Sequence, residues 1–444
     1  MNKPSILIKH AQLVTMNAKD EVFTGDVWIE AGRIQAVAPE LNAAADRVID
    51  AGGKVLLPGF IQTHVHLCQT LFRGRADDME LLDWLKKRIW PLEGAHDEES
   101  VFYSALLGIG ELIRSGTTTI LDMETVRHAD AAFRAMAESG IRAISGKVMM
   151  DRGEDVPESL AEDTDRSMQE SVDLLERWHG YDGGRLGYAF CPRFVLSCTE
   201  RLLLGVRDLS EQYGVLVHTH ASENRSEIEL VERELGMRNV VYFDHIGLAT
   251  PRLVLAHGVW LDEQEKRIVR DRGVKLTHCP GSNLKLASGI AEVPDLLTRS
   301  IAMGIGADGA PCNNTLDMYQ EMKLTALLHK VKHGPRAMDA KTALRMATIG
   351  GAEVLGLERE IGSIEAGKKA DLQLVDLNEF HAYPAYDADV YSRLVYAAGR
   401  ADVDTVLIDG NIVMENKTVL TVDKAVVLAE TDRCIRRLLE RIGG

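Results

Sequence analysis

Apolar and polar positions alternate in short runs at both ends of the chain, a pattern typical of β-strands. Residues 5–13 alternate in this way, and Gly32 separates the next two runs, as expected of a hairpin turn. The same texture returns in residues 405–414, around a central Asp-Gly pair. We therefore expect residues 1–57 and residues 359–422 to build one small composite β-sandwich together.

Residues 58–358 have a different pattern, in which short apolar runs alternate with amphipathic stretches of helical period. Repeated strand-then-helix spacing indicates a parallel sheet. About 300 residues of it favour a closed (β/α)8 TIM barrel over an open doubly wound sheet. No GxGxxG or GxxxxGK[ST] sequence opens a helix, which counts against nucleotide-binding folds. The remaining residues, 423–444, are expected to carry a C-terminal surface helix.

Composition and charge narrow the possible functions. The 444 residues are 45% hydrophobic, which is ample for a large core, and the formal net charge of −16 disfavours nucleic acid or an anionic membrane as a partner. The six cysteines show no CxxC spacing, so we expect free thiols in a reducing compartment. No apolar run reaches transmembrane length or forms a secretion signal. These features predict a cytoplasmic enzyme with a small-molecule substrate.

Reactive side chains follow several of the predicted barrel strands, where the chemistry of such barrels is located. His64 and His66 end the first strand, and residues two apart in a strand point to the same side. This pair alone is a weak signal, but His220, His257 and Asp308 follow later strands. Imidazoles and a carboxylate suit zinc or ferrous iron. We therefore expect His64, His66, His220 and Asp308 to bind a metal that activates water.

Neighbouring residues also have structural interpretations. His218 alternates with the predicted ligand on its strand, so we expect it to face the core or to support a neighbour. His278 also follows a strand, and its pattern leaves open whether it lines the pocket or supports the site. Asp308 could cap the following helix. The joint occurrence of reactive groups at four strand ends favours a metal site.

These positions carry a resemblance to a known family. Pro58-Gly-Phe-x-x-x-His64-x-His66, His220-x-x-Glu223, His257-Gly and Gly306-x-Asp308-Gly resemble the motifs of the amidohydrolase superfamily, in its purine and triazine aminohydrolase branch. The resemblance covers nearly the whole chain. It implies a distorted (β/α)8 barrel with a composite β-sandwich. It also implies a homo-oligomer, because family members are commonly dimers or tetramers.

The resemblance also implies a mechanism. One divalent metal, zinc or, as the alternative, iron, would be held by the four residues named above and would lower the pKa of water towards neutrality. Asp308 would accept the water's proton, Glu223 would protonate a ring nitrogen of the substrate, and His257 would steady the attacking oxygen. Glu223 also has a structural interpretation, as a carboxylate at a helix N-terminus. The presence of all the expected polar groups disfavours a homologue that has lost catalysis.

The substrate is less well determined. Trp84 and Glu93 lie in segments that resemble deaminases of adenosine derivatives, namely 5′-deoxyadenosine, methylthioadenosine or S-adenosylhomocysteine. In that group the residue matching Glu93 holds the ribose hydroxyls, and the residue matching Trp84 lines the pocket. We expect an adenosine derivative to be the substrate, and an aminohydrolase that converts it to the inosine derivative and ammonia.

Two alternatives remain open. Arg193 and Phe194, together with Gln69, resemble guanine deaminase, in which the matching glutamine and arginine grip the base. This favours guanine or a related aminopurine. Residues 351–376 and 403–416 resemble s-triazine amino- or chlorohydrolases, but they lie in or near the predicted sandwich and say little about the substrate.

Overall fold

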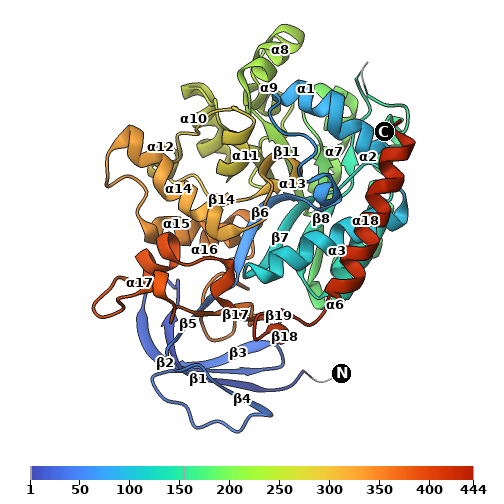
Figure 1. Cartoon of the computed structure of the whole chain (residues 1–444). Coiled ribbons are helices and arrows are strands. Elements are labelled where there is room, and N and C mark those ends of the chain that lie inside the picture. Colours follow the sequence, from blue (N-terminus) through green and yellow to red (C-terminus); the bar gives the residue numbers. More distant parts are fainter. Residues whose placement is uncertain (1–2, 154–155, 444) are drawn as a thin grey trace.

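The structure, a computed structural model, describes residues 3–153 and 156–443. It consists of an α/β barrel and a smaller β-sheet unit, which lies below the barrel in Figure 1. The smaller unit contains strands from both ends of the chain, and the barrel is formed by the residues between them.

Within the described residues, eight parallel strands form a closed barrel. Consecutive strands pair in parallel, and the circle closes where the first barrel strand pairs with the last, through Gln62 and Ile305. The strands are β6 (Phe60–His66), β7 (Thr117–Met123), β8 (Arg142–Gly146), β10 (Leu186–Pro192), β11 (Leu216–Ala221), β12 (Leu253–His257), β13 (Lys275–His278) and β14 (Met303–Ile305). The expected (β/α)8 barrel is confirmed.

Helices alternate with these strands and cover the outside of the barrel (Figure 1). The longer ones are α3 (Glu98–Arg114), α4 (Ala129–Ser139), α5 (Thr164–Trp178), α7 (Glu200–Tyr213), α8 (Arg225–Leu235), α10 (Glu263–Arg272) and α14 (Met318–His333). Helix α18 (Lys424–Arg441) follows the last strand and packs along α3.

Local chemistry sets the ends of the barrel helices. The Thr199 side chain accepts a hydrogen bond from the Leu202 amide at the start of α7, at 3.2 Å, and Asp262 forms a capping box at the start of α10. Both helices end at a glycine with a left-handed backbone, Gly214 (φ 69°) and Gly273 (φ 67°). The chain can therefore turn sharply into the next strand, which begins within two residues.

The strands of both chain ends are joined by hydrogen bonds into one nine-stranded sheet. Its order is β19-β18-β17-β16-β5-β1-β2-β3, with β4 beside β1. The bounds are β1 (Ile6–Val14), β2 (Val22–Glu30), β3 (Arg33–Ala38), β4 (Arg47–Asp50), β5 (Lys54–Pro58), β16 (Leu372–Asp376), β17 (Val403–Ile408), β18 (Asn411–Glu415) and β19 (Thr418–Val419). Antiparallel pairing of β5 with β16 joins the two ends. We expected a sandwich from these residues; the structure joins their strands into one nine-stranded sheet.

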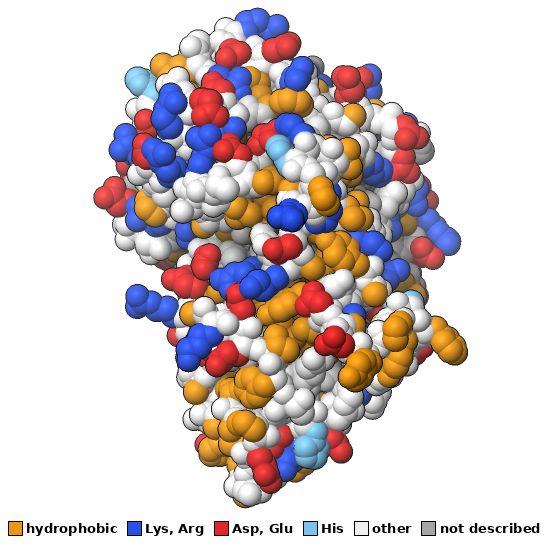
Figure 2. Space-filling view, turned by 90° about the vertical axis from the view of Figure 1, so that its left-hand side faces the viewer, with side chains coloured by type: hydrophobic (Ala, Val, Ile, Leu, Met, Phe, Trp, Pro, Cys, Tyr) orange, Lys and Arg blue, Asp and Glu red, His pale blue; other side chains and the backbone are white. Residues whose placement is uncertain are grey.

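On the face in Figure 2, acidic and basic side chains are interleaved, so the net negative charge forms no single-sign field there. Among the described residues, no helix has the length and apolarity that crossing a membrane requires. All six cysteines are buried and free, which confirms the expectation of unpaired thiols.

A buried ion pair joins the sheet unit to the barrel. Arg142, on β8, donates from Nε and Nη2 to the two carboxylate oxygens of Asp371, at 2.6 and 3.1 Å. The same carboxylate accepts from the backbone amide of Asp409 at 2.6 Å. Both charged side chains are nearly inaccessible to solvent. A buried charge that loses its partner is costly, so this contact should matter for stability.

We predict that Asp371→Ala lowers the free energy of unfolding by about 3–5 kcal/mol, because the buried Arg142 guanidinium loses both of its hydrogen bonds to Asp371 and keeps a longer ion pair, 3.7 Å, with Asp409. Denaturant unfolding measures the loss. The matched control is Asp83→Ala, which breaks the solvent-exposed pair with Lys87 and should cost less than about 1 kcal/mol. Equal losses of unfolding free energy in the two variants would show that the buried pair contributes no more to stability than the exposed one.

Candidate metal centre and active site

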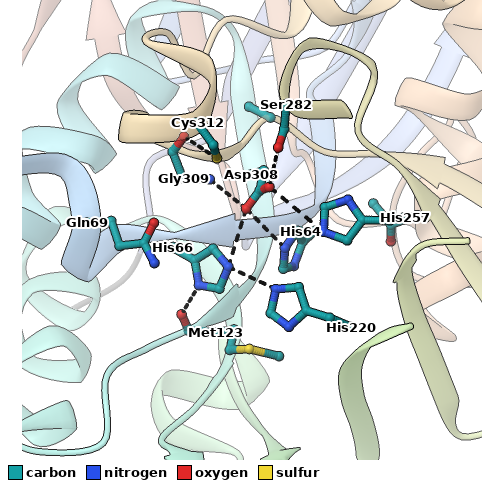
Figure 3. A network of polar contacts seen from close by, with 12 residues as sticks. His64, His66, Gln69, Met123, His220, His257, Ser282, Asp308, Gly309 and Cys312 are labelled. Carbon is teal, nitrogen blue, oxygen red and sulfur yellow. Dashed lines mark hydrogen bonds and ion pairs between the residues drawn. The ribbon is translucent and has the colours of Figure 1, made fainter. Parts of the chain in front are cut away.

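Four side chains that can bind a metal converge at the carboxyl end of the barrel (Figure 3). His64 and His66 lie at the end of β6 and His220 on β11. Asp308 begins the short strand β15 (Asp308–Gly309), which pairs with β6 beside Val65. One ligand atom from each of the four lies within 4.8 Å of the others. The structure thus brings together all four residues for which the sequence predicted metal binding.

Two of the imidazoles are oriented by backbone carbonyls. His66 Nδ1 lies 2.7 Å from the carbonyl oxygen of Met123, and His220 Nδ1 lies 2.7 Å from that of Arg193. A carbonyl oxygen can only accept, so both Nδ1 atoms carry the proton and donate. The Nε2 atoms therefore present lone pairs towards the centre of the cluster, as metal ligands require.

The third imidazole is oriented by another histidine. His218 Nδ1 lies 3.1 Å from the Val254 carbonyl oxygen, so it donates there and leaves its own Nε2 as an acceptor. That Nε2 lies 2.7 Å from His64 Nδ1, which donates to it. His64 Nε2 is then buried without a hydrogen-bond partner within the described residues. An unpartnered buried lone pair in this position is what a bound metal would satisfy.

The protonation states also suit a divalent metal. Burial lowers the pKa of His66 to about 3, so this imidazole is neutral. Burial raises the pKa of Asp308, but its contacts with the imidazoles of His64, His257 and His66 outweigh that effect and hold the pKa well below its usual value. Three neutral imidazoles and one carboxylate form a donor set typical of catalytic divalent metals. The residues present therefore fit a divalent metal.

Asp308 has further contacts that fix its carboxylate. Oδ1 lies 3.3 Å from Nε2 of both His64 and His66 and accepts from the Gly309 amide at 2.8 Å. Oδ2 accepts from the Ser282 hydroxyl at 2.6 Å. Both carboxylate oxygens are thus held within the cluster, and the helix-capping interpretation does not account for this set of contacts.

His257 and Glu223 face the cluster from the neighbouring strand ends. His257 Nε2 lies 3.5 Å from Glu223 Oε2 and 3.9 Å from Asp308 Oδ2. Burial lowers the pKa of His257, but the charges of Glu223 and Asp308 outweigh it and raise the pKa above its usual value. This imidazole can therefore act as a hydrogen-bond donor beside the metal position.

Glu223 can hold a proton near neutral pH. Burial raises the pKa of Glu223 to about 7. The Ser288 hydroxyl donates to Oε1 at 3.2 Å, and Oε2 remains facing His257. The Glu223 amide donates to Glu227 Oε2 at 2.9 Å, which fixes the backbone. The arrangement can present a proton at the inner end of the pocket.

A pocket opens beside the cluster. Part of its wall comes from α1 (Leu81–Trp84) and from the π-helical turn η2 (Leu85–Ile89) that follows it. Its apolar lining residues are Leu81, Trp84, Leu85, Phe194 and Leu286. Its polar lining residues are His66, Gln69, Arg193, His220, Glu223, Glu227, His257 and Asp308. An apolar wall facing a few fixed polar groups is the usual construction of a small-molecule site.

Gln69, Glu93 and Arg193 form one buried unit. Arg193 donates from Nη1 and Nη2 to the two Glu93 oxygens, at 2.5 and 3.2 Å. Gln69 Nε2 donates to Glu93 Oε1 at 2.9 Å. Gln69 and Arg193 line the pocket, whereas Glu93 lies behind them. Residues for which the sequence suggested different purines are therefore hydrogen-bonded to each other.

The sequence interpretation missed several residues of the site. Glu227 lines the pocket, Ser288 contacts Glu223 and Ser282 contacts Asp308. Glu227 could have been found from its spacing, because Asn224 and Glu227 form a capping box at the start of α8, which brings the Glu227 side chain back towards Glu223. The two serines come from the segment after β13, and nothing in their spacing indicates a contact with either carboxylate.

Comparison with known proteins identifies the class. The amidohydrolase family model matches residues 55–413, which span the barrel and most of the second half of the sheet unit. The chain belongs to the amidohydrolase family. This agrees with the strand-end histidines and with the carboxylate of Asp308, which follows the last barrel strand.

Two relatives match almost from end to end. A 5′-deoxyadenosine deaminase of Methanobrevibacter smithii is 41% identical over 442 residues, covering 99% of each chain. A 5-methylthioadenosine/S-adenosylhomocysteine deaminase of Desulforudis audaxviator is 40% identical over 442 residues, covering 98% of this chain and all of the relative.

Solved structures are similar over the same extent. An adenosine deaminase from Xanthomonas campestris with bound zinc superposes with a TM-score of 0.91 at 34% identity, covering 98% of both chains. Guanine deaminase from E. coli superposes with a TM-score of 0.82 at 29% identity, covering 93% of this chain and 99% of the other.

We predict that His218→Phe lowers the affinity for a divalent metal about 10- to 100-fold, because His64 loses the acceptor that fixes its tautomer. Competition with a chelator measures the affinity. His278→Phe is the matched control: it removes a buried strand-end imidazole whose ring nitrogens have no hydrogen-bond partner within the described residues. It should leave metal affinity unchanged, and a similar loss in both variants would contradict a specific role for His218.

Proposed function

We propose that this chain is a metal-dependent hydrolytic deaminase of an adenosine derivative: 5′-deoxyadenosine, methylthioadenosine or S-adenosylhomocysteine. The products would be ammonia and the corresponding inosine derivative. The observation that carries the proposal is the convergence of three Nε2 lone pairs and the Asp308 carboxylate beside a protonatable Glu223. The names of the two full-length relatives support an adenosine derivative as substrate.

We infer that His64, His66, His220 and Asp308 hold one zinc ion, with iron as the alternative. Imidazole-rich sites with one carboxylate accept both metals. The bound zinc of the similar Xanthomonas structure supports the first choice.

The chemistry that such a metal supplies is the activation of water at neutral pH. Asp308 accepts a proton from the attacking water because its carboxylate is ionised. Glu223 donates its proton to the ring nitrogen next to the amino-bearing carbon, which prevents charge from building up on the ring. His257 donates from Nε2 to the incoming oxygen. Asp308 then passes its proton to the nitrogen, and the carbon–nitrogen bond breaks to release ammonia. The hydroxyl group left on the ring carbon loses its proton as the carbonyl forms, and this proton restores the Glu223 carboxyl group, so one water is consumed for each amino group released.

A second candidate, guanine or a related aminopurine, is favoured by one specific observation. Arg193 and Gln69 line the pocket, and the Glu93 carboxylate behind them is already bonded to both. In this arrangement Glu93 offers less free capacity to ribose hydroxyls than an unpaired carboxylate would. Arginine and glutamine side chains could instead present donors and an acceptor to a purine base.

We predict that the zinc-loaded protein releases ammonia from adenosine derivatives faster than from free bases. The test measures kcat/KM for 5′-deoxyadenosine, methylthioadenosine, S-adenosylhomocysteine, adenosine, guanine and melamine. Faster turnover of guanine than of every nucleoside would reverse the order of the two candidates. No ammonia from any of the six compounds would overturn the proposed function.

Two control measurements belong to this panel. Removal of the metal with a chelator should abolish ammonia release, and addition of zinc should restore it. Glu93→Ala should raise KM for nucleosides more than for free bases if the carboxylate contacts ribose. An equal effect on both would assign Glu93 to the support of Arg193 alone.

We predict that kcat/KM decreases as the pH rises above about 7, because Glu223 has a raised pKa of about 7 and must be protonated to donate. Below that pH the group carries its proton, and above it the active fraction falls about tenfold per pH unit. A pH–rate profile measures this limb. Glu223→Gln should remove the limb together with most of the activity, and a rate that still rises between pH 7 and 9 would assign the proton transfer to another group.

A further inference from the structure

Helix α18 lies along α3, and its C-terminal end lies beside α2 (Trp90–Gly94) (Figure 1). Its buried residues Cys434, Ile435 and Leu438 belong to the same hydrophobic cluster as Leu81 and Trp84, which line the pocket. The last helix of the chain and the substrate side of the active site therefore share one packed core.

Arginines four residues apart on α18 bind the start of α3. Arg437 donates to Glu99 at 2.8 Å and to Asp97 at 2.9 Å. Arg441 donates to the other oxygen of Asp97 at 2.7 Å and to the Ala95 carbonyl at 2.6 Å. Such spacing places the guanidinium groups on one face of the helix. Both arginines therefore hold the short corner between α2 and α3.

Asp97 is the centre of this corner. Its side chain accepts from the Ser100 amide at 2.9 Å, which caps α3, while it also binds the two arginines. Partial burial raises the pKa of Asp97, but the Ser100 amide and Arg441 outweigh it and lower the pKa to about 2. The carboxylate is thus ionised at neutral pH and carries the charge that both arginines bind.

The corner continues into the substrate side of the pocket. His96, next to Asp97, lies with Nε2 2.9 Å from the Cys68 carbonyl oxygen and therefore donates to it. Gln69, which directly follows Cys68 in the chain, donates a hydrogen bond to Glu93, and Glu93 lies four residues before Asp97. Hydrogen bonds thus run from the corner held by α18 to the buried unit of Gln69, Glu93 and Arg193.

We propose that Arg437 and Arg441 are positioning residues for substrate binding, which hold Glu93 and the Leu81–Trp84 wall in place through the Ala95–Asp97 corner. They touch neither the metal ligands nor the proton-transfer groups. This role concerns the substrate-binding side of the proposed deaminase site, and it rests on that proposed function. Loss of the two guanidinium groups should therefore weaken binding and leave the chemical step intact.

The kinetic test uses the zinc-loaded full chain with 5′-deoxyadenosine. Arg437→Ala/Arg441→Ala should raise KM about tenfold, with kcat within about twofold of the parent and zinc content unchanged. Arg437→Lys/Arg441→Lys should recover most of the loss, since the charges remain. Arg436→Ala is the matched control, because Arg436 is exposed on the same helix and has no hydrogen bond or ion pair within the described residues. It should change neither constant.

An unchanged KM in the double variant, or a fall in kcat together with zinc content, would overturn the proposal. If the double variant does not fold, Arg441→Ala alone, which keeps the Arg437–Asp97 bond, undergoes the same measurement. Hydrogen exchange supplies a readout without turnover: amides of residues 81–95 should exchange about tenfold faster in the variant than in the parent. Unchanged exchange there overturns the proposal, and faster exchange without deamination of any nucleoside refutes only the proposed function.

Discussion

Three buried imidazoles can converge on one metal only if each donates its Nδ1 proton to an acceptor behind it. Without such acceptors the proton could reside on either nitrogen, and a ring protonated at Nε2 has no lone pair for a metal. The carbonyl oxygens of Met123 and Arg193 impose the tautomer on His66 and His220. His218 imposes it on His64, because its own Nδ1 proton is committed to the Val254 carbonyl. The rest of the site is built around this constraint.

Closure of the barrel supplies these acceptors. Met123 ends β7, the neighbour of the strand that carries His66, and Arg193 follows β10, the neighbour of the strand that carries His220. Val254 lies on β12, paired with His218. Each orienting carbonyl thus comes from an adjacent strand, and none is available before the strands have paired. Metal affinity should therefore depend on the whole barrel, and local loop structure should contribute little.

The sequence signals differ between the residues that fit a metal and those on the substrate side of the pocket. Period-two alternation and the placement of His64, His66, His220 and Asp308 after apolar runs are local signals, and the barrel topology turns them into one site. Contacts between residues far apart leave no such signal. Arg193 and Glu93 are separated by 100 positions, and the sequence offered each as evidence for a different purine. Likewise, strand alternation predicts that both chain ends form strands, but it does not predict that β5 and β16 join them into one sheet.

This difference has a physical origin. The four residues that fit a metal are attached to paired strands, whose backbone hydrogen bonds hold each ligand in a geometry that a single side-chain change on the surface cannot move. The pocket wall opposite is attached to helices and turns, and its position depends on side-chain contacts such as the Asp97 pairs with α18. A substitution in a helix can therefore shift Trp84 or Glu93 while His64 and His66 stay in place. The same hydrolytic centre can in this way serve different aminated rings, and substrate preference has to be determined from the helical side of the pocket.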